Sequence, residues 1–330
     1  MGGVMDEREN ALRIIRFGSP ERVVESPPWR FVRYFGCEHE GFEGGGPDMP
    51  VGSRWKDIWG TGWRRELESI MGFPGEYPPA DVGALRDYQW PDPNDERLCS
   101  EVYRVAERER REGVFLMGSH REVLWEKAYM LVGMENLMVY FRTEPGFVRE
   151  VLRRVMDFQL GMAEHYLKVG VEFVAPNDDM GAQTGPLLGP DIVDEFLMPE
   201  YERLFEVYRK GGVMIRFHSC GNVEWMLERF MKLGVDVLHP VQATANDLTR
   251  VREATQGRMA LEGGVSTVTI MKGPAEAIER EVRERLWQLG REGGYFCAAD
   301  QCLPFPEEHI GALRKAVGKY GRYPLERPEW

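Results

Sequence analysis

From residue 100 onward, short apolar runs alternate strictly with longer amphipathic stretches, and no other feature of the sequence constrains the fold as much. The apolar runs have the length of buried strands, whereas the stretches between them have helical periodicity. The runs expected to form strands are 113–117, 171–175, 213–217, 235–238, 259–261 and 295–299. The stretches expected to form helices are 101–112, 147–168, 191–210, 222–233, 247–255, 274–289 and 307–320. This alternation predicts parallel strands that are joined by right-handed crossovers.

Two parallel architectures can hold these units: an open doubly wound sheet and a closed (β/α)8 TIM barrel. Polar residues follow nearly every expected strand, which favours the barrel, because the carboxyl ends of all barrel strands meet at one mouth. The two strands still needed would come from residues 1–100, an irregular part with a helix expected at 7–16 and a loop at 41–50. We therefore predict an α/β protein in which residues 1–330 form one barrel domain with an irregular N-terminal extension. Neither GxGxxG after a strand nor GxxxxGK[ST] occurs, so these two routes to nucleotide binding are unsupported.

Charge and hydropathy exclude several classes of partner. The chain has 42 Lys and Arg against 54 Asp and Glu, a net charge of −12, which disfavours a nucleic-acid backbone as partner. No window approaches the ~20 apolar residues of a membrane span. The N-terminus lacks the apolar core of a signal peptide, so we expect a cytoplasmic protein. An odd, irregularly spaced set of cysteines is expected to act as free thiols or metal ligands: Cys37, Cys99, Cys220, Cys297 and Cys302.

The sharpest candidate site follows the expected strand 213–217. His218 and Cys220 are two residues apart, so both can point to one side if the chain stays extended, and together they make half of a tetrahedral zinc site. Cys302, just past the last expected strand, could supply a third ligand, with Cys297 inside that strand as the alternative. A fourth position is left for a substrate thiol, a water or a carboxylate. The residues alone leave open that the late cysteines are buried apolar side chains and that His218 is a hydrogen-bonded barrel histidine.

Other polar residues beside strand ends are candidates for catalysis or substrate binding. Asn177, Asp178 and Asp179 follow the expected strand 171–175. Neighbours on an extended chain point to opposite sides, so we expect one of the two acids to face the mouth as a metal ligand, a cation-binding group or a general base. Capping of a helix or loop is the alternative for these acids. The remaining candidates stand beside the other strand ends: His120, His239, Gln242, Glu262 and Gln301.

Taken together, these segments resemble the uroporphyrinogen decarboxylase superfamily, particularly its decarboxylase-like branch and its corrinoid-dependent methyltransferases. The resemblance is carried by residues 11–23, 88–93, 177–186, 217–222, 234–242, 262–265 and 293–295. It implies a (β/α)8 barrel. The decarboxylases bind propionate groups through an Arg-Gln-Ala-Gly-Arg-type motif that region 30–37 lacks, and they carry a histidine about where Gln301 stands. Porphyrinogen decarboxylation is therefore not expected.

The methyltransferase branch implies a mechanism. Its members bind zinc through His-x-Cys and a late cysteine; His218 and Cys220 match this motif, and Cys302 lies one position beyond the matching frame. Zinc would activate a thiol that accepts a methyl group, for instance from a corrinoid carried by a partner protein. The resemblance and the placement beside strand ends together assign catalytic roles to Asp178, Asp179 and Gln242. Substrate-binding roles are assigned to His120, Asn177, His239 and Gln301.

Two other interpretations stand beside this one. A decarboxylase would need no metal and would present basic residues at the mouth, with Arg30, Arg33 and Arg216 as candidates. A non-catalytic member of the family would keep the barrel pocket without metal geometry. The methyl donor and acceptor are expected to be small molecules or a corrinoid protein, and a homodimer is among the assemblies left open.

Overall fold

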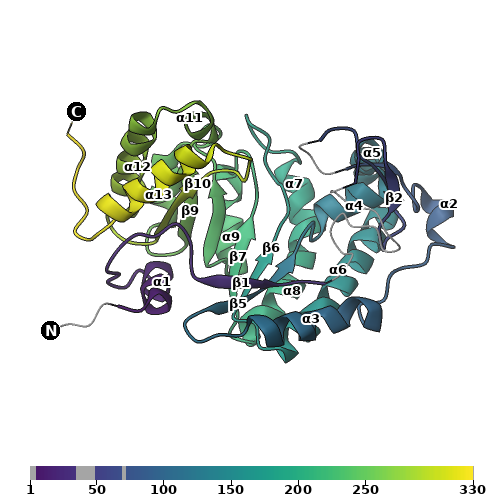
Figure 1. Ribbon diagram of the computed structural model, residues 1–330. Helices are drawn as coiled ribbons and strands as arrows, with labels where there is room; N and C mark the ends of the chain where they lie inside the picture. The colour runs from purple at the N-terminus through teal and green to yellow at the C-terminus, as the bar shows by residue number, and fades with distance from the viewer. Residues whose placement is uncertain (1–4, 35–48, 69–71, 330) are drawn as a thin grey trace.

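A curled sheet of seven parallel strands forms the centre of the computed structural model, which describes residues 5–34, 49–68 and 72–329 (Figure 1). The strands are β1 (Trp29–Val32), β5 (Phe115–His120), β6 (Phe173–Pro176), β7 (Met214–His218), β8 (Val237–Val241), β9 (Ala260–Val265) and β10 (Tyr295–Ala299). Their order in space is their order in the chain. A doubly wound sheet would reverse that order at a switch point, so the arrangement is that of a curled, barrel-like sheet.

Helices join these strands as the alternation predicted, and one more helix follows the last strand. They are α3 (Glu96–Glu109), α6 (Pro145–Lys168), α8 (Met198–Lys210), α9 (Leu227–Leu233), α10 (Leu248–Thr255), α12 (Ala275–Gly290) and α13 (Glu307–Tyr320). A short helix α7 (Pro190–Ile192) and a π-helical turn (Val193–Leu197) lead into α8, and a 3-10 turn (Glu224–Met226) leads into α9. No helix in the described ranges is both long and apolar enough to cross a membrane.

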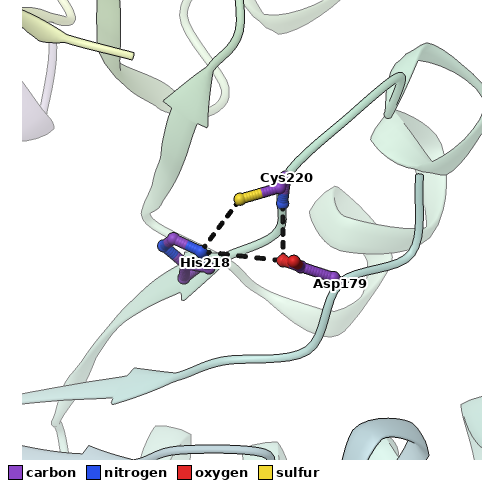
Figure 2. Close-up of side chains that lie close together, drawn as sticks. All are labelled: Asp179, His218 and Cys220. Carbon is purple, nitrogen blue, oxygen red and sulfur yellow. Dashed lines mark hydrogen bonds and ion pairs between the residues drawn. The ribbon is translucent and has the colours of Figure 1, made fainter. Parts of the chain in front are cut away.

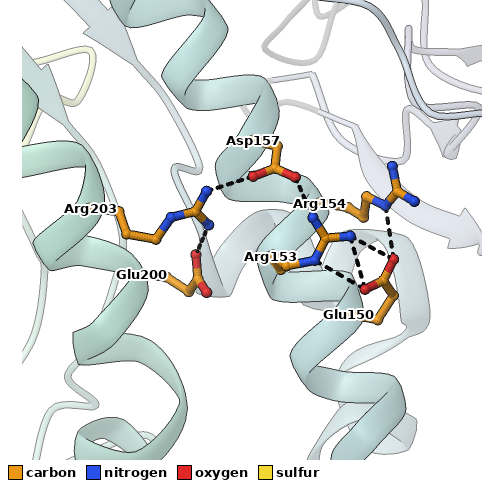
Figure 3. A network of polar contacts seen from close by, with 6 residues as sticks. All are labelled: Glu150, Arg153, Arg154, Asp157, Glu200 and Arg203. Carbon is orange, nitrogen blue, oxygen red and sulfur yellow. Dashed lines mark hydrogen bonds and ion pairs between the residues drawn. The ribbon is translucent and has the colours of Figure 1, made fainter.

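The outer faces of α6 and α8 are tied by a chain of ion pairs (Figure 3). Arg153 on α6 bonds Asp157, at 2.7 Å, and Glu150, and Arg203 on α8 bonds the same Asp157 at 2.6 Å. Most of these pairs join residues three or four apart on one helix and are half-exposed, so each contributes well under about 1 kcal/mol. The Arg203–Asp157 pair is the one that crosses between the helices.

The first hundred residues differ from the expectation that they supply two barrel strands. Within the described residues they supply one, β1, which pairs with β5. A main-chain hydrogen bond of 2.9 Å from Cys297 in β10 to Val24 links the other end strand to the segment before β1. The same part forms an antiparallel sheet of β2 (Arg54–Lys56), β3 (Gly62–Arg64) and β4 (Phe73–Glu76). Cys37 and most of the loop expected at 41–50 lie outside the described residues.

Four helices were not predicted. They are α2 (Val82–Leu85), α4 (Trp125–Val132), α5 (Met134–Thr143) and α11 (Thr267–Lys272). The helix expected at 7–16 is confirmed as α1 (Glu7–Ile15). Its apolar side chains pack against the inward-facing residues at the amino ends of the strands, including Phe115 and Phe173. The amino end of the curled sheet is thereby filled, and the opposite, carboxyl end remains for the candidate site.

Candidate metal centre

Two loops at the carboxyl ends of neighbouring strands bring Asp179, His218 and Cys220 together (Figure 2). Asp179 lies on the loop after β6, His218 ends β7, and Cys220 follows two residues later. The ligand atoms of all three side chains lie within 4.8 Å of one another. The parallel pairing continues past β6, where Asn177 bridges to His218 and Asp178 N donates to His218 O at 3.0 Å. This pairing sets Asn177 level with His218 and brings Asp179, two residues later, beside Cys220.

The distances within the group suit a tetrahedral metal ion. The Cys220 Sγ atom is 3.3 Å from His218 Nε2, and that nitrogen is 3.6 Å from Asp179 Oδ1. Zinc with bonds of about 2.0–2.3 Å and tetrahedral angles separates its ligand atoms by about 3.3–3.6 Å. A carboxylate oxygen, an imidazole nitrogen and a sulfur are all zinc ligands in proteins, so the donor set also fits.

Two glycines allow the loops to approach each other. Gly221 has φ of +79°, and a Cβ atom there would lie 2.1 Å from the carbonyl oxygen of Gly181. A Cβ atom on Gly181 would lie 2.4 Å from the carbonyl oxygen of Asn222. The main chains therefore touch without side chains between them, and the Cys220 N–H reaches Asp179 Oδ1 at 2.8 Å.

Burial sets the protonation of the group without a metal. Burial and, to a lesser extent, the nearby Asp179 carboxylate together raise the pKa of the Cys220 thiol to about 12, against the opposing effect of the Gln301 amide. Burial also lowers the pKa of His218 to about 4. Both side chains are thus neutral at pH 7, and a bound cation would favour the thiolate.

Three of the predicted residues surround the group. Gln301 donates its amide N–H to Cys220 Sγ at 3.0 Å. Gln242 accepts the Gly221 N–H at 3.0 Å, so it holds the loop that carries Cys220. His239 contacts His218 through their Nδ1 atoms, 2.8 Å apart.

Asp178 faces away from this group. Its carboxylate accepts the main-chain N–H groups of Leu124, Trp125 and Glu126 at 2.7–3.0 Å and the hydroxyl of Tyr201 at 2.5 Å. Burial raises its pKa to about 7. As expected, one of the two acids faces the mouth, and it is Asp179; Asp178 caps α4.

His120 is likewise held in the core. Its Nδ1 contacts Gln159 Oε1 at 2.7 Å and its Nε2 contacts the hydroxyl of Tyr208, while burial lowers its pKa to about 4. Of the late cysteines, Cys297 is fully buried in β10 and Cys302 is exposed, and the ligand group includes neither. A ligand role for Cys302 stays a prediction.

Sequence reasoning passed over Glu126, in the first turn of α4. This buried carboxylate accepts the Asn177 amide at 2.8 Å. Burial raises its pKa well above the usual range, and the neighbouring Asp179 and Asp178 raise it further. No local pattern marks it, because α4 is buried on nearly every side and therefore shows no amphipathic period.

Arg216, two residues before His218 on β7, forms a buried bidentate ion pair with Glu262 on β9. Arg216 Nε and Nη2 lie 2.7 and 2.8 Å from the Glu262 carboxylate oxygens, and the guanidinium stacks over Trp29 at 4.7 Å. The charge of Arg216 is therefore balanced by the Glu262 carboxylate, and Glu262 has a structural role.

A known protein family resembles this chain in sequence, and known structures resemble it in fold. Residues 76–320 match the family model described as uroporphyrinogen decarboxylase (URO-D). The structure overlays on a methyltransferase from Methanosarcina mazei with a TM-score of 0.71 and 16% sequence identity, covering 96% of this chain and 99% of that one. A B12-independent methionine synthase from a Shewanella species overlays with a TM-score of 0.41 and 12% identity, over 62% of this chain and 60% of that one. The sequence matches none of the curated proteins with which it was compared.

Proposed function

The chain belongs to the uroporphyrinogen decarboxylase family, and from this premise we propose that it is a methyltransferase whose bound zinc ion activates a thiol acceptor. The observation that carries the proposal is the convergence of Asp179, His218 and Cys220 at the carboxyl end of the sheet. The decarboxylase itself needs no such set of ligands, whereas a thiol-activating enzyme does. The similarity of fold to the Methanosarcina mazei methyltransferase points the same way.

In this proposal Asp179, His218 and Cys220 hold the ion. Three protein ligands leave one position open for the acceptor, and Cys302, next in the chain to Gln301, is a candidate to approach that position. When bound, zinc lowers the pKa of a thiol so that it reacts as a thiolate at neutral pH. Over the whole reaction the acceptor sulfur gains a methyl group and releases its proton, and the donor gives up the methyl group as a cation.

The chain's own residues prepare this site. The Asp179 carboxylate and the Cys220 N–H lock the two loops together, and Gln242 holds the Gly221 N–H, so the ligands are set before any ion arrives. Gln301 donates to the Cys220 sulfur, which stabilises negative charge there. We assign the methyl donor to a corrinoid carried by a partner protein, as the resemblance implies, and place the protein in the cytoplasm.

Metal content and zinc affinity test the proposal. We expect close to one zinc per chain in protein purified without chelator. Cys220→Ser should abolish tight binding of zinc, and Asp179→Asn should weaken it at least ten-fold. Cys302→Ser shows whether Cys302 also binds the ion. Unchanged affinity in that variant assigns the third ligand to Asp179 alone. Wild-type protein that neither contains nor takes up zinc would rule out the mechanism.

A metal-free decarboxylase is the second candidate, favoured by one feature of the carboxyl end of the sheet. Arg33 and Arg121 lie with Ser119 and Trp59 around a cavity of about 10 Å³, which has room for about one water molecule, so a carboxylate would have to reach these arginines from outside the cavity. This interpretation predicts that an Arg121→Ala variant loses substrate binding while zinc neither binds nor matters. The zinc measurement on the wild-type protein therefore separates the two candidates.

A further inference from the structure

The two histidines beside the candidate metal centre form a direct pair. His218 and His239 are partners in register on the parallel strands β7 and β8, so both side chains leave the sheet on the same face. The main chain supports the pairing, because Ser219 N donates to His239 O at 2.8 Å. The two Nδ1 atoms are 2.8 Å apart, and the rings are tilted by 43° with centroids 4.9 Å apart.

A contact between two Nδ1 atoms needs one hydrogen between them, so one ring donates and the other accepts. The second nitrogen of His218, Nε2, faces Cys220 Sγ at 3.3 Å and Asp179 Oδ1 at 3.6 Å. A ligand nitrogen must offer a lone pair to the metal, and the Nε2 atom of His218 is the one in place to do so. The hydrogen of His218 then sits on Nδ1 and is donated to His239.

We propose that His239 is the positioning residue of the metal centre: it accepts the Nδ1–H of His218 and thereby fixes the tautomer and the ring orientation that the metal requires. A metal-binding histidine commonly has its other N–H held by a carboxylate, a carbonyl or a water, and here a second imidazole takes that place. The metal part of this inference rests on the proposed function. The tautomer can be tested apart from the metal, because in the protein without an ion the Cys220 S–H, 3.3 Å away, is a donor that faces Nε2 and leaves the hydrogen of His218 on Nδ1.

The pairing also determines what His239 offers to a ligand. Its Nδ1 lone pair is occupied by His218, so its own hydrogen lies on Nε2. Within the residues that the structure describes, this nitrogen has no hydrogen-bond partner, and the residue as a whole is half-buried. A molecule that enters the mouth therefore meets a hydrogen-bond donor at His239, consistent with the predicted substrate-binding role.

The first test is the tautomer itself, measured on the metal-free full-length protein labelled with 15N-histidine. Two-bond 1H–15N correlations distinguish Nδ1–H from Nε2–H, and the chain has six histidines, so His218→Gln and His239→Asn are enough to assign the pair. We expect Nδ1–H for His218 and Nε2–H for His239. The reverse arrangement, in which His239 donates to His218, would overturn the inference.

The second test uses two substitutions that differ in one property. His239→Asn keeps an acceptor, Oδ1, close to the place of Nδ1, whereas His239→Leu removes it. Zinc affinity, measured by competition with a chromogenic chelator, should fall about 10–100-fold in the Leu variant and only a few-fold in the Asn variant. Equal affinity in wild type and His239→Leu, or equal losses in both variants, would overturn the positioning role.

The two proposals fail in distinguishable ways. If the wild-type protein takes up no zinc, the proposed function fails, and the tautomer measurement alone decides the role of His239. If His239→Leu does not fold, as its thermal unfolding would show, the Asn variant decides: a loss of 10-fold or more there contradicts the inference, and a smaller loss together with the expected tautomer supports it.

Discussion

His120 and His218 end two strands of one sheet, yet they stand in different surroundings. The His120 ring is turned towards α6 and α8, where Gln159 and Tyr208 occupy both of its nitrogens. The His218 ring has one nitrogen on His239 and the other directed at Cys220 and Asp179. Burial lowers the pKa of both rings to about 4. A low pKa therefore does not distinguish the two histidines, whereas the set of groups around Nε2 makes His218 the candidate metal ligand.

The core position of His120 predicts a dependence of stability on pH. Its pKa is about 4 in the folded protein and about 6.5 in the unfolded chain, so the unfolded state binds more protons between these values. Stability should fall as the pH drops from 6.5 towards 4, by roughly 2 kcal/mol between pH 7 and 4.5 from this ring alone. His120→Gln lacks the titration, so urea unfolding should show a smaller acid loss in the variant. Equal losses in both proteins would contradict this prediction.

The sequence predicted the residues of the site better than their roles. The spacing of His218 and Cys220 was sufficient to predict that they lie together, because side chains two residues apart on an extended chain point to the same side. The choice between Asp178 and Asp179 depends on where the extended conformation ends, which no local pattern records. The role of Asp179 beside Cys220 depends on two glycines, Gly181 and Gly221, that are far apart in the sequence and meet only in the fold.

At the scale of elements, the site is built where strand ends meet a helix start. Asp178, just past β6, accepts three consecutive N–H groups at the beginning of α4, and this cap also turns Glu126 towards Asn177 and Asp179. The helix has no cap from its own first residues, so the acid on the loop after β6 takes that role. The position of α4 is thus coupled to the loop that carries Asp179.

We expect Asp178→Ala to destabilise the protein by about 3 kcal/mol or more, because it leaves several buried donors without an acceptor. Asp247→Ala is the matched control: it also removes an N-terminal cap, on α10, but one exposed to solvent, where the cost should be about 1 kcal/mol. Chemical denaturation of the two variants measures both values. Similar losses would show that Asp178 acts as an ordinary cap.

The meeting of the two loops yields a second prediction for the same region. Gly221→Ala would place a methyl group against the main chain of Gly181 and should push the loops apart, so that zinc affinity falls at least ten-fold. Gly212→Ala is the control, since Gly212 has a similar φ of +68° but nothing within 4 Å of the added carbon. That variant should lose about 1 kcal/mol of stability and keep its zinc affinity. Unchanged zinc affinity in Gly221→Ala would contradict the close approach.

The repeating part of the fold could be predicted because its signals are local. Each strand from β5 to β10 begins with apolar residues and has a polar residue at its end or just past it, and most of the helices between them have an exposed face. By contrast, α4 has seven buried residues among its eight, Trp125–Val132, so no amphipathic period marks it. The strands β2 and β3 have three residues each, too few to show an alternation.

At the scale of the whole molecule, the two ends of the curled sheet have separate tasks. The amino end is filled by α1, whose Ala11, Ile14 and Ile15 join inward-facing strand residues in an apolar cluster. The carboxyl end holds the polar residues of the candidate site, with the Arg216–Glu262 pair between the two regions. This division places apolar packing at one end and the candidate site at the other, as expected for barrels.

A substitution at the amino end should therefore change stability without changing the site. Ile14 is fully buried in the cluster, so Ile14→Ala should cost about 3 kcal/mol in chemical denaturation, from lost burial and the cavity left behind. Zinc affinity, measured well below the unfolding transition, should stay within two-fold of wild type, because the ligands are held by loops at the other end of the strands. Val268→Ala, at a side chain 47% exposed, is the control and should change stability by less than about 0.5 kcal/mol. A fall in zinc affinity of Ile14→Ala under conditions where it stays folded would show that the two ends are coupled, because the strands would then transmit the loss of packing to the metal ligands.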